Sequence, residues 1–286
     1  MAFLLAVSAA ASWGVAMTVA KPGARHLDPI SFLLARWTLA LILALLAGLI
    51  TGRLRFPGWS AVGFVALGSL LNAVVGWMLY LLAMRRAPGF QVTALASTAP
   101  LWGVLGAILF VAEPFRWPAL VAALLVIVGA FFLIGGRSAI RSTRPTGVAP
   151  ALAAGMLWGV SETVPMKLAT QRGMPAEASI MVFAVTAIAG LLVLAPVLRR
   201  WIPRRVDRRG LHLAAISAVS GAFLGWLLWL NSLRLAPASV LAPVRGSTLL
   251  FTFIFSILFL RERPARIAVV GVLLVFGGVL LVSIGT

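Results

Sequence analysis

The chain has 286 residues, of which 62% are hydrophobic and only 10% are charged. A mean hydropathy of +1.09 excludes an ordinary soluble domain and predicts an integral membrane protein. The formal net charge of +18 does not indicate nucleic-acid binding, because basic loops of membrane helices commonly set orientation in the bilayer. With no cysteine and only two histidines, we expect no disulfide, no metal site and no cofactor.

Ten continuously apolar runs follow one another along the chain, separated by short breaks. Each is long enough to cross a hydrocarbon core of about 30 Å as a helix, and none alternates as a barrel strand would. We therefore predict an all-α integral membrane fold of ten transmembrane helices. The first run has no basic leader or cleavage site, so we expect it to be retained. The runs are approximately 2–20, 29–50, 59–84, 88–111, 117–135, 148–168, 176–198, 210–233, 237–260 and 264–284.

The candidate ligands in the first half are aromatic or neutral polar side chains. In the fourth run, Gln91, Thr98 and Trp102 share one helix face at i, i+7 and i+11. Arg36, early in the second run, is predicted to be structural. Polar side chains in membrane helices also serve as interhelical hydrogen-bond partners, so both interpretations stay open. The candidates are Trp13, Asn72, Trp77, Tyr80, Gln91, Thr98 and Trp102.

The stretch WGVSETVPMK opens the second half and carries the carboxylate of Glu162 inside an apolar run. An ionisable group at the bilayer centre costs roughly 2.5 kcal/mol or more and usually marks an ion or substrate path. The alternative is a carboxylate neutralised by a structural arginine. Trp158 shares a helix face with Glu162, and Pro165 predicts a locally broken helix because it lacks a backbone donor. Glu162 is thus a candidate for substrate binding and for proton coupling.

Arg245 is the corresponding cation, in the ninth run, with Thr248 and Thr252 on the same face. It could bind a substrate carboxylate or neutralise Glu162. In the eighth run, Trp226 and Trp229 repeat the i, i+3 spacing of Trp77 and Tyr80. The candidates of the second half are Trp158, Glu162, Trp226, Trp229, Asn231 and Arg245, with no catalytic residue and no metal ligand.

Other unusual residues are predicted to be structural. Glu113 and Glu262 lie at helix ends, where capping and loop ion pairs are expected. Gly221 and Gly225 have a GxxxG spacing that predicts close helix contact rather than a dimer. Tryptophans near the ends of runs are interpreted as interface anchors, namely Trp37, Trp59, Trp117 and Trp201.

The two halves resemble each other. Gly76-Trp77 aligns with Gly225-Trp226, and Ala87-Pro88 aligns with Ala236-Pro237, both at an offset of 149 residues. Each repeat would contain five helices, which is an odd number of membrane crossings. The second copy would therefore enter the membrane from the opposite side, as in the inverted repeats of secondary transporters. We predict repeats at residues 1–136 and 147–286, joined by a linker at 137–146.

These motifs together resemble the drug/metabolite transporter superfamily, specifically two EamA-type domains. The shared features are the WG of the first helix of each half, the arginine early in the second, the AP that opens the fourth, and the glutamate that closes it. The resemblance implies a bacterial inner-membrane carrier for small metabolites, often an exporter of amino acids. Exporters of aromatic amino acids are a closer comparison within this superfamily.

The sequence therefore predicts a secondary transporter, most simply an exporter of amino acids by alternating access. An organic-cation or drug efflux carrier and a non-transporting structural membrane protein are the alternatives; an enzyme is not expected, because no acid, base and nucleophile cluster. The partners are a small-molecule substrate and the lipid bilayer, with a monomer sufficient and a dimer left open. Sixteen basic residues follow odd-numbered runs and six lie on the opposite side, which predicts termini outside. Familiar superfamily members have cytoplasmic termini, so orientation stays open.

Overall fold

The computed structural model describes the chain except for residues 87–91, 93–94, 134–144, 200–204, 261–266 and 285–286. The described residues form helices and no strand, as predicted. The first half contains α1 (Ala2–His26), α2 (Pro29–Thr51), α3 (Trp59–Ser69), the π-helix η1 (Leu70–Gly76), α4 (Trp77–Arg86), α6 (Ala99–Val111) and α7 (Trp117–Leu133).

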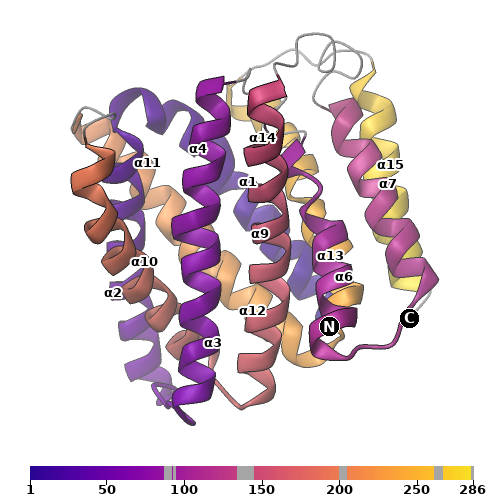
Figure 1. Cartoon of the computed structure of the whole chain (residues 1–286), viewed down its shortest axis with the longest axis horizontal. Helices are drawn as coiled ribbons and strands as arrows, with labels where there is room; N and C mark the ends of the chain where they lie inside the picture. The colour runs from indigo at the N-terminus through magenta and orange to yellow at the C-terminus, as the bar shows by residue number, and fades with distance from the viewer. Residues whose placement is uncertain (87–91, 93–94, 134–144, 200–204, 261–266, 285–286) are drawn as a thin grey trace.

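The second half repeats this order of elements. It contains α9 (Pro145–Gln171), α10 (Ala176–Leu198), α11 (Arg208–Ser217), the π-helix η2 (Ala218–Gly225), α12 (Trp226–Leu235), α13 (Ala238–Gly246), α14 (Thr248–Leu260) and α15 (Ala268–Ile284). The start of α1 and the end of α15 lie at the same end of the bundle in Figure 1, as an even number of membrane crossings requires.

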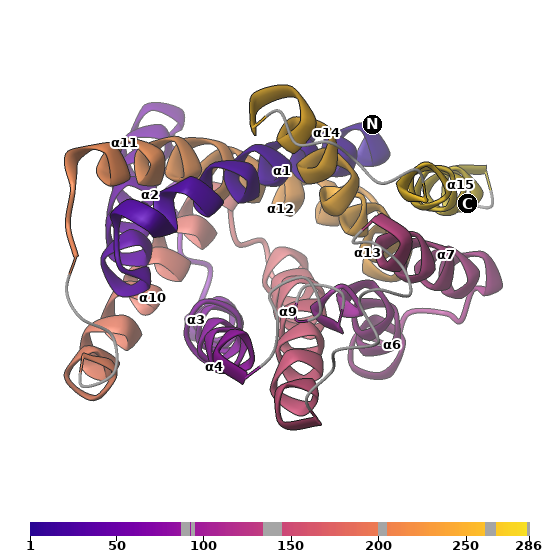
Figure 2. The ribbon, with the colours of Figure 1, turned by 90° about the horizontal axis from the view of Figure 1, so that it is seen from above.

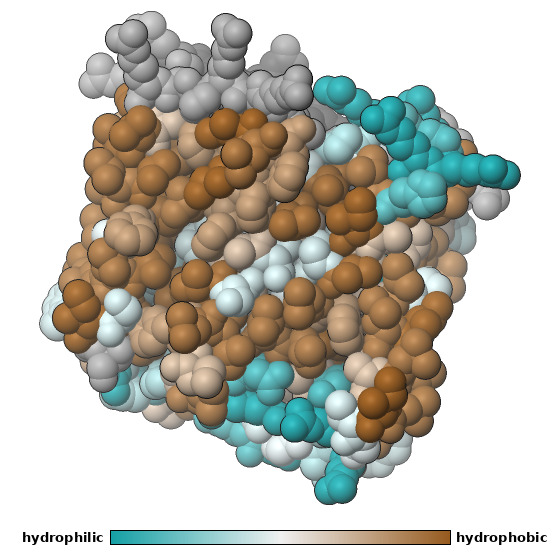
Figure 3. Space-filling model, turned by 180° about the vertical axis from the view of Figure 1, so that it is seen from behind, coloured by the Kyte–Doolittle hydropathy of each residue, from teal (hydrophilic) through white to brown (hydrophobic). Residues whose placement is uncertain are grey.

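The helices are long and apolar enough for a multi-pass membrane protein. Six described segments meet the length and hydropathy of a membrane span, while α6, α7 and α15 are shorter apolar helices. The described helices follow the ten predicted runs in order, and the count of ten is consistent with them. Large apolar side chains such as Leu46, Leu49 and Val193 lie exposed on the outside. Figure 3 shows such residues over most of one face, as expected where lipid covers the protein.

The two halves interlock, because the first helix of each half packs among helices of the other. Helix α1 packs against α11, η2, α12 and α14, and α9 packs against α3, η1, α4 and α6. Helix α2 also packs against α10, and α7 packs against α15. Figure 2 shows α1 beside α11 and α12 on one side of the bundle, with α3, α4 and α9 on the opposite side. Residues of both halves are therefore placed around the centre of the bundle.

Asp28 ties the start of α2 to the connection that precedes α11. It precedes Pro29, which is a favoured first helical residue, and its Oδ1 accepts a hydrogen bond from the Ser31 N–H at 3.0 Å. Its carboxylate also lies 2.9 Å from Arg199 Nη1 and accepts from the Arg205 N–H at 3.0 Å. Burial alone would raise the pKa of Asp28, but these hydrogen bonds outweigh it and leave the pKa below its usual value.

Two helices depart from α-helical geometry at equivalent places. The π-helices η1 and η2 both end at a glycine that is followed by a tryptophan. In the ninth run, α13 ends at Gly246 and α14 begins at Thr248, so that run is interrupted beside Arg245. The break predicted at Pro165 was wrong: α9 continues through it to Gln171, and Gly68 of α3 gives the proline ring room.

Candidate functional site

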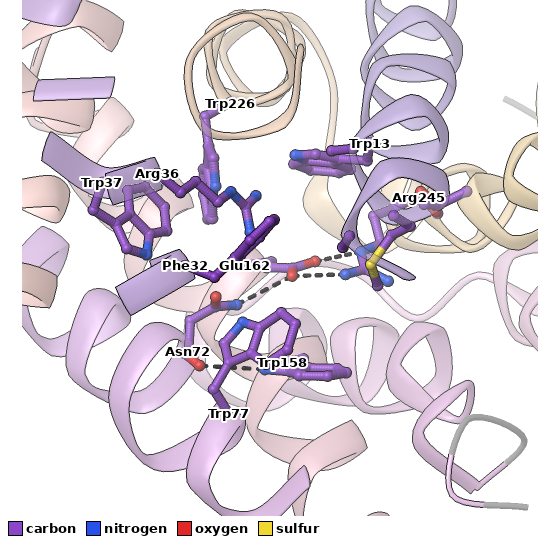
Figure 4. Close-up of a pocket in the computed structure, with 14 residues that line it drawn as sticks. Trp13, Phe32, Arg36, Trp37, Asn72, Trp77, Trp158, Glu162, Trp226 and Arg245 are labelled. Atoms are coloured by element: carbon purple, nitrogen blue, oxygen red, sulfur yellow. Dashed lines mark hydrogen bonds and ion pairs between the residues drawn. The ribbon is translucent and has the colours of Figure 1, made fainter. Parts of the chain in front are cut away.

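A cavity of about 60 Å³ lies between the interlocked halves, lined by residues of both (Figure 4). Helices α1, α2, η1 and α4 contribute from the first half, and α9, α12, α13 and α14 from the second. Its three ionisable side chains are Arg36, Glu162 and Arg245. Its aromatic lining consists of Trp13, Phe32, Trp37, Trp77, Trp158 and Trp226.

Glu162 and Arg245 form a two-pronged ion pair at one side of this cavity. Arg245 Nη2 donates to Glu162 Oε1 at 2.7 Å, and Arg245 Nε donates to Oε2. The Glu162 side chain is 7% exposed and the Arg245 side chain 20%. Such a bidentate pair is geometrically specific and satisfies a charge that would be costly if left alone in an apolar interior. Of the two roles predicted for Arg245, neutralising Glu162 is the one seen in this structure.

Asn72 of η1 supports the carboxylate from the other half. Its Nδ2 donates to Glu162 Oε1 at 3.1 Å and lies 3.2 Å from Ser161 Oγ. The Ser161 hydroxyl donates in turn to the Trp158 carbonyl at 3.2 Å. Both carboxylate oxygens therefore accept hydrogen bonds from protein donors, and the group is held in one orientation.

The first aromatic triad consists of Trp158, Trp77 and Tyr80. The Trp158 ring centroid lies 5.5 Å from that of Trp77 and 5.1 Å from that of Tyr80. Its indole N–H donates to the Asn72 carbonyl of η1 at 3.2 Å. An added Cβ on Gly76 would lie 2.7 Å from the indole nitrogen, so glycine is what lets this ring approach.

The second aromatic triad, made of Trp13, Trp226 and Trp229, repeats these contacts. The Trp13 ring centroid lies 5.8 Å from both partners. Its indole N–H donates to the Gly221 carbonyl of η2 at 3.0 Å, and a Cβ on Gly225 would lie 2.6 Å from the indole nitrogen. The Arg245 guanidinium carbon lies 5.5 Å from the Trp13 ring centroid, within the range of a cation–π contact.

The predicted site residues divide into those at the cavity and those behind it. Tyr80 and Trp229 back the lining rings, and the Trp229 indole donates to the Glu162 carbonyl at 2.8 Å. Asn231 donates to the Leu227 carbonyl of its own helix. Thr98 and Trp102 hydrogen-bond to each other at 3.3 Å away from the lining, and Gln91 lies outside the described residues. Those that line the cavity are Trp13, Asn72, Trp77, Trp158, Glu162, Trp226 and Arg245.

Two residues predicted to be peripheral or structural also line the cavity. Trp37 is 1% exposed and stacks near Phe183, at 4.8 Å between centroids, so its interpretation as an interface anchor was wrong. Trp59 and Trp117 are exposed as anchors would be, and Trp201 lies outside the described residues. Arg36 points into the cavity beside Trp226 (Figure 4). Its position as a charged residue inside an apolar run could have identified Arg36 as a cavity residue, as it did for Glu162.

Several charged groups outside the cavity hold helix ends. Glu113 accepts hydrogen bonds from the N–H groups of Ala238 and Ser239 at 2.7 and 2.8 Å, which confirms its capping role at the start of α13. Lys167 donates to the Ala236 carbonyl at 2.7 Å and to the Leu233 carbonyl at the end of α12. Glu262 lies outside the described residues. Within the described part of the chain, no three acidic or histidine side chains come together as metal ligands.

The division of the chain into two similar halves is also found when it is compared with known protein families. A model of the EamA-like transporter family matches the chain twice, over residues 1–135 and 145–284. The chain belongs to this family. It is a multi-pass membrane transporter and not an enzyme, and the resemblance to the drug/metabolite transporter superfamily is confirmed at this level.

Two similar proteins align with most of the chain. Protein PecM of Dickeya dadantii (strain 3937) is 30% identical over 251 residues, which span 85% of this chain and 82% of that protein. A solved crystal structure matches with a TM-score of 0.83 and 19% identity, covering 99% of this chain and 96% of the other. At that identity the similarity shows the fold alone.

Proposed function

We propose that the protein is a secondary transporter that exports small metabolites across a bacterial inner membrane, with amino acids as its substrates. The observation that carries this proposal is the cavity between two interlocked halves, lined by five tryptophans and containing a fixed ion pair. Tryptophan faces favour planar or apolar bodies by stacking, and arginines favour a carboxylate. An amino acid, and an aromatic one in particular, has both features.

The small size of the cavity supports alternating access as the mode of transport. Its volume of about 60 Å³ has room for a few water molecules, whereas drug-sized ligands occupy pockets of about 300–1,000 Å³. A metabolite would bind only when helices of the two halves move apart. The π-helices and the interruption between α13 and α14 lie beside the cavity, where irregular backbone allows a helix to bend.

The decisive experiment is an uptake assay with the full chain in liposomes. Amino acids, with the aromatic ones included, and organic cations are offered with and without an imposed pH gradient. Saturable uptake of amino acids supports the proposal. Uptake of organic cations alone would replace it by cation efflux, and no uptake of any compound would reject small-metabolite transport.

The same assay tests whether Glu162 couples a proton gradient to transport. Glu162→Gln keeps the shape of the side chain and removes its charge. If Glu162 couples, the variant loses gradient-driven accumulation but retains exchange; if the group is only a partner for Arg245, the variant loses folded protein instead. Normal accumulation by a stable variant would exclude both roles.

Orientation can be measured because the chain has no cysteine of its own. A single cysteine at Val206, in the arginine-rich connection before α11, is predicted to be cytoplasmic by the loop charges. It should then resist impermeant thiol reagents in intact cells. Rapid labelling would give the opposite orientation, with cytoplasmic termini.

A further inference from the structure

The charges that line the cavity do not balance. Glu162 and Arg245 neutralise each other, and Asn72 supplies a further donor to the carboxylate. Arg36 is the third ionisable side chain of the lining. The described lining therefore has an excess of one positive charge, located on α2.

Arg36 has no acidic partner among the described residues. Its buried Nε makes no hydrogen bond with the described part of the chain, and the guanidinium carbon lies 5.3 Å from the centroid of the Trp37 ring. The five described carboxylates are engaged elsewhere: Asp28 with Arg199, Glu113 with the start of α13, Glu162 with Arg245, Glu177 with Arg53, and Asp207 with His26. A counter-ion for Arg36 is thus not provided by the described protein.

The backbone of η2 keeps room for this guanidinium. A Cβ on Gly221 would lie 3.0 Å from Arg36 Nη2 and 2.5 Å from the Ala16 side chain. At the equivalent position of η1 stands Asn72, whose amide reaches Glu162. Where one half has a polar side chain, the other has a glycine with an arginine beside it.

A cation held in a partly apolar interior without a partner is costly, and in membrane proteins such a group usually serves transport. A guanidinium binds a carboxylate through two parallel hydrogen bonds. We infer that Arg36 is the anchor for the anionic group of the transported metabolite, with a carboxylate as its chemical class, and that Trp226 and the neighbouring rings hold its apolar body. This inference rests on the proposed function and narrows its substrates to apolar or aromatic carboxylates, amino acids included. An organic cation would meet an excess positive charge and, within the described lining, no free carboxylate.

The test compares three ligands of nearly equal shape on the purified full chain. These are 3-phenylpropanoate, its neutral amide and 3-phenylpropylamine, and their binding is followed by the tryptophan fluorescence of the protein, to which the five cavity tryptophans contribute. The carboxylate should bind about ten- to a hundredfold more tightly than the amide, as for hydrogen bonds to a charged group, and the amine should bind least well. Equal binding of carboxylate and amide by the unaltered protein would overturn the inference.

The variant Arg36→Gln should reduce binding of the carboxylate to the level of the amide and leave the amide unchanged. Arg172→Gln is the matched control, because Arg172 lies exposed in the turn after α9, away from the cavity lining. It donates to the Leu168 carbonyl and lies over the Phe64 ring. This control variant should bind all three ligands as the unaltered protein does. An equal loss for carboxylate and amide in folded Arg36→Gln would make Arg36 a structural residue and refute the inference.

Two provisions keep the test decisive. If Arg36→Gln does not fold, Arg36→Lys is used instead, because it retains the positive charge without the two-pronged guanidinium. This variant should keep a smaller preference for the carboxylate over the amide. Loss of that preference in folded Arg36→Lys would count against Arg36 as the anchor for an anionic group. Binding is also independent of flux. If liposomes show no transport while Arg36-dependent selection of the carboxylate persists, the proposed function fails and the anion site stands.

Discussion

The two aromatic triads share a scaffold but differ in the chemistry beside it. In each, an indole N–H donates to a π-helix carbonyl, and a glycine four residues after that carbonyl lets the ring approach. Next to the Trp158 triad stand Asn72, Ser161 and Glu162. The corresponding places next to the Trp13 triad hold Gly221, Ala16 and Met17.

This difference indicates that the duplicated packing and the single charged site can be separated. In each repeat, an indole from the other half donates to a backbone carbonyl of the π-helix. This indole-to-carbonyl hydrogen bond requires no charged group, and it occurs in both halves. The carboxylate needs a cation, and Arg245 is available on one side only, because its counterpart in the first half is Ala96.

Removal of the cation should have the largest effect on stability. Arg245→Ala leaves Glu162 buried without its partner, and we expect a loss of about 3–5 kcal/mol in the free energy of unfolding. Thermal and denaturant unfolding in detergent would measure it. The double variant Arg245→Ala with Glu162→Gln should recover most of the loss. No recovery would mean that Arg245 stabilises by packing rather than by charge.

Filling the glycines should damage both triads to a similar and smaller extent. Gly76→Ala and Gly225→Ala each place a Cβ less than 3 Å from an indole nitrogen, and we expect about 1–3 kcal/mol of destabilisation in both. Gly63→Ala and Gly277→Ala are the controls, because no neighbour lies within 4 Å of an added Cβ. They should be neutral or slightly stabilising. A large loss at only one triad would show that the equivalence is superficial.

Loss of the indole donor alone should have a smaller effect again. Trp13→Phe and Trp158→Phe keep an aromatic ring but leave the Gly221 or Asn72 carbonyl without its indole donor. We expect each to lower the unfolding free energy by about 1 kcal/mol. Amide hydrogen exchange of η1 and η2 would show whether each π-helix loosens. Unchanged exchange and stability in both variants would remove these hydrogen bonds as the reason for the π-helices.

The starts of α2 and α10 give the smallest contrast. Asp28 caps α2, whereas α10 follows Pro175 without a side-chain cap. Asp28→Asn keeps a capping oxygen and loses the charge, so we expect a loss of about 0.5–1 kcal/mol at neutral pH. Because the folded pKa of Asp28 is lowered, its contribution is present above the unfolded value and disappears as the pH falls through the folded value. Unfolding curves of both proteins from pH 7 to pH 3 should therefore converge; a difference that does not change with pH would show that the charge of Asp28 is not its cause.

Much of the fold could be predicted from hydropathy and spacing. The apolar runs placed the helices, and the repeated Gly-Trp pairs identified equivalent positions that the structure places in matching surroundings. Trp37 could not be assigned in this way. An aromatic residue near a helix end has the same local pattern whether it faces the interface or another helix, and only the position of Phe183 in α10 distinguishes them.

By itself, the sequence determined that this is a helical membrane protein with two related halves and few intramembrane charges. Those properties depend on local hydrophobicity and on patterns that repeat along the chain. Only the tertiary structure decided that Glu162 is bound by Arg245 and Asn72, and that Arg36 faces the same cavity without an acidic partner among the described residues. The physical reason is that the partner of a charge depends on distances of a few ångströms between helices remote in sequence. Interlocking of the halves sets those distances.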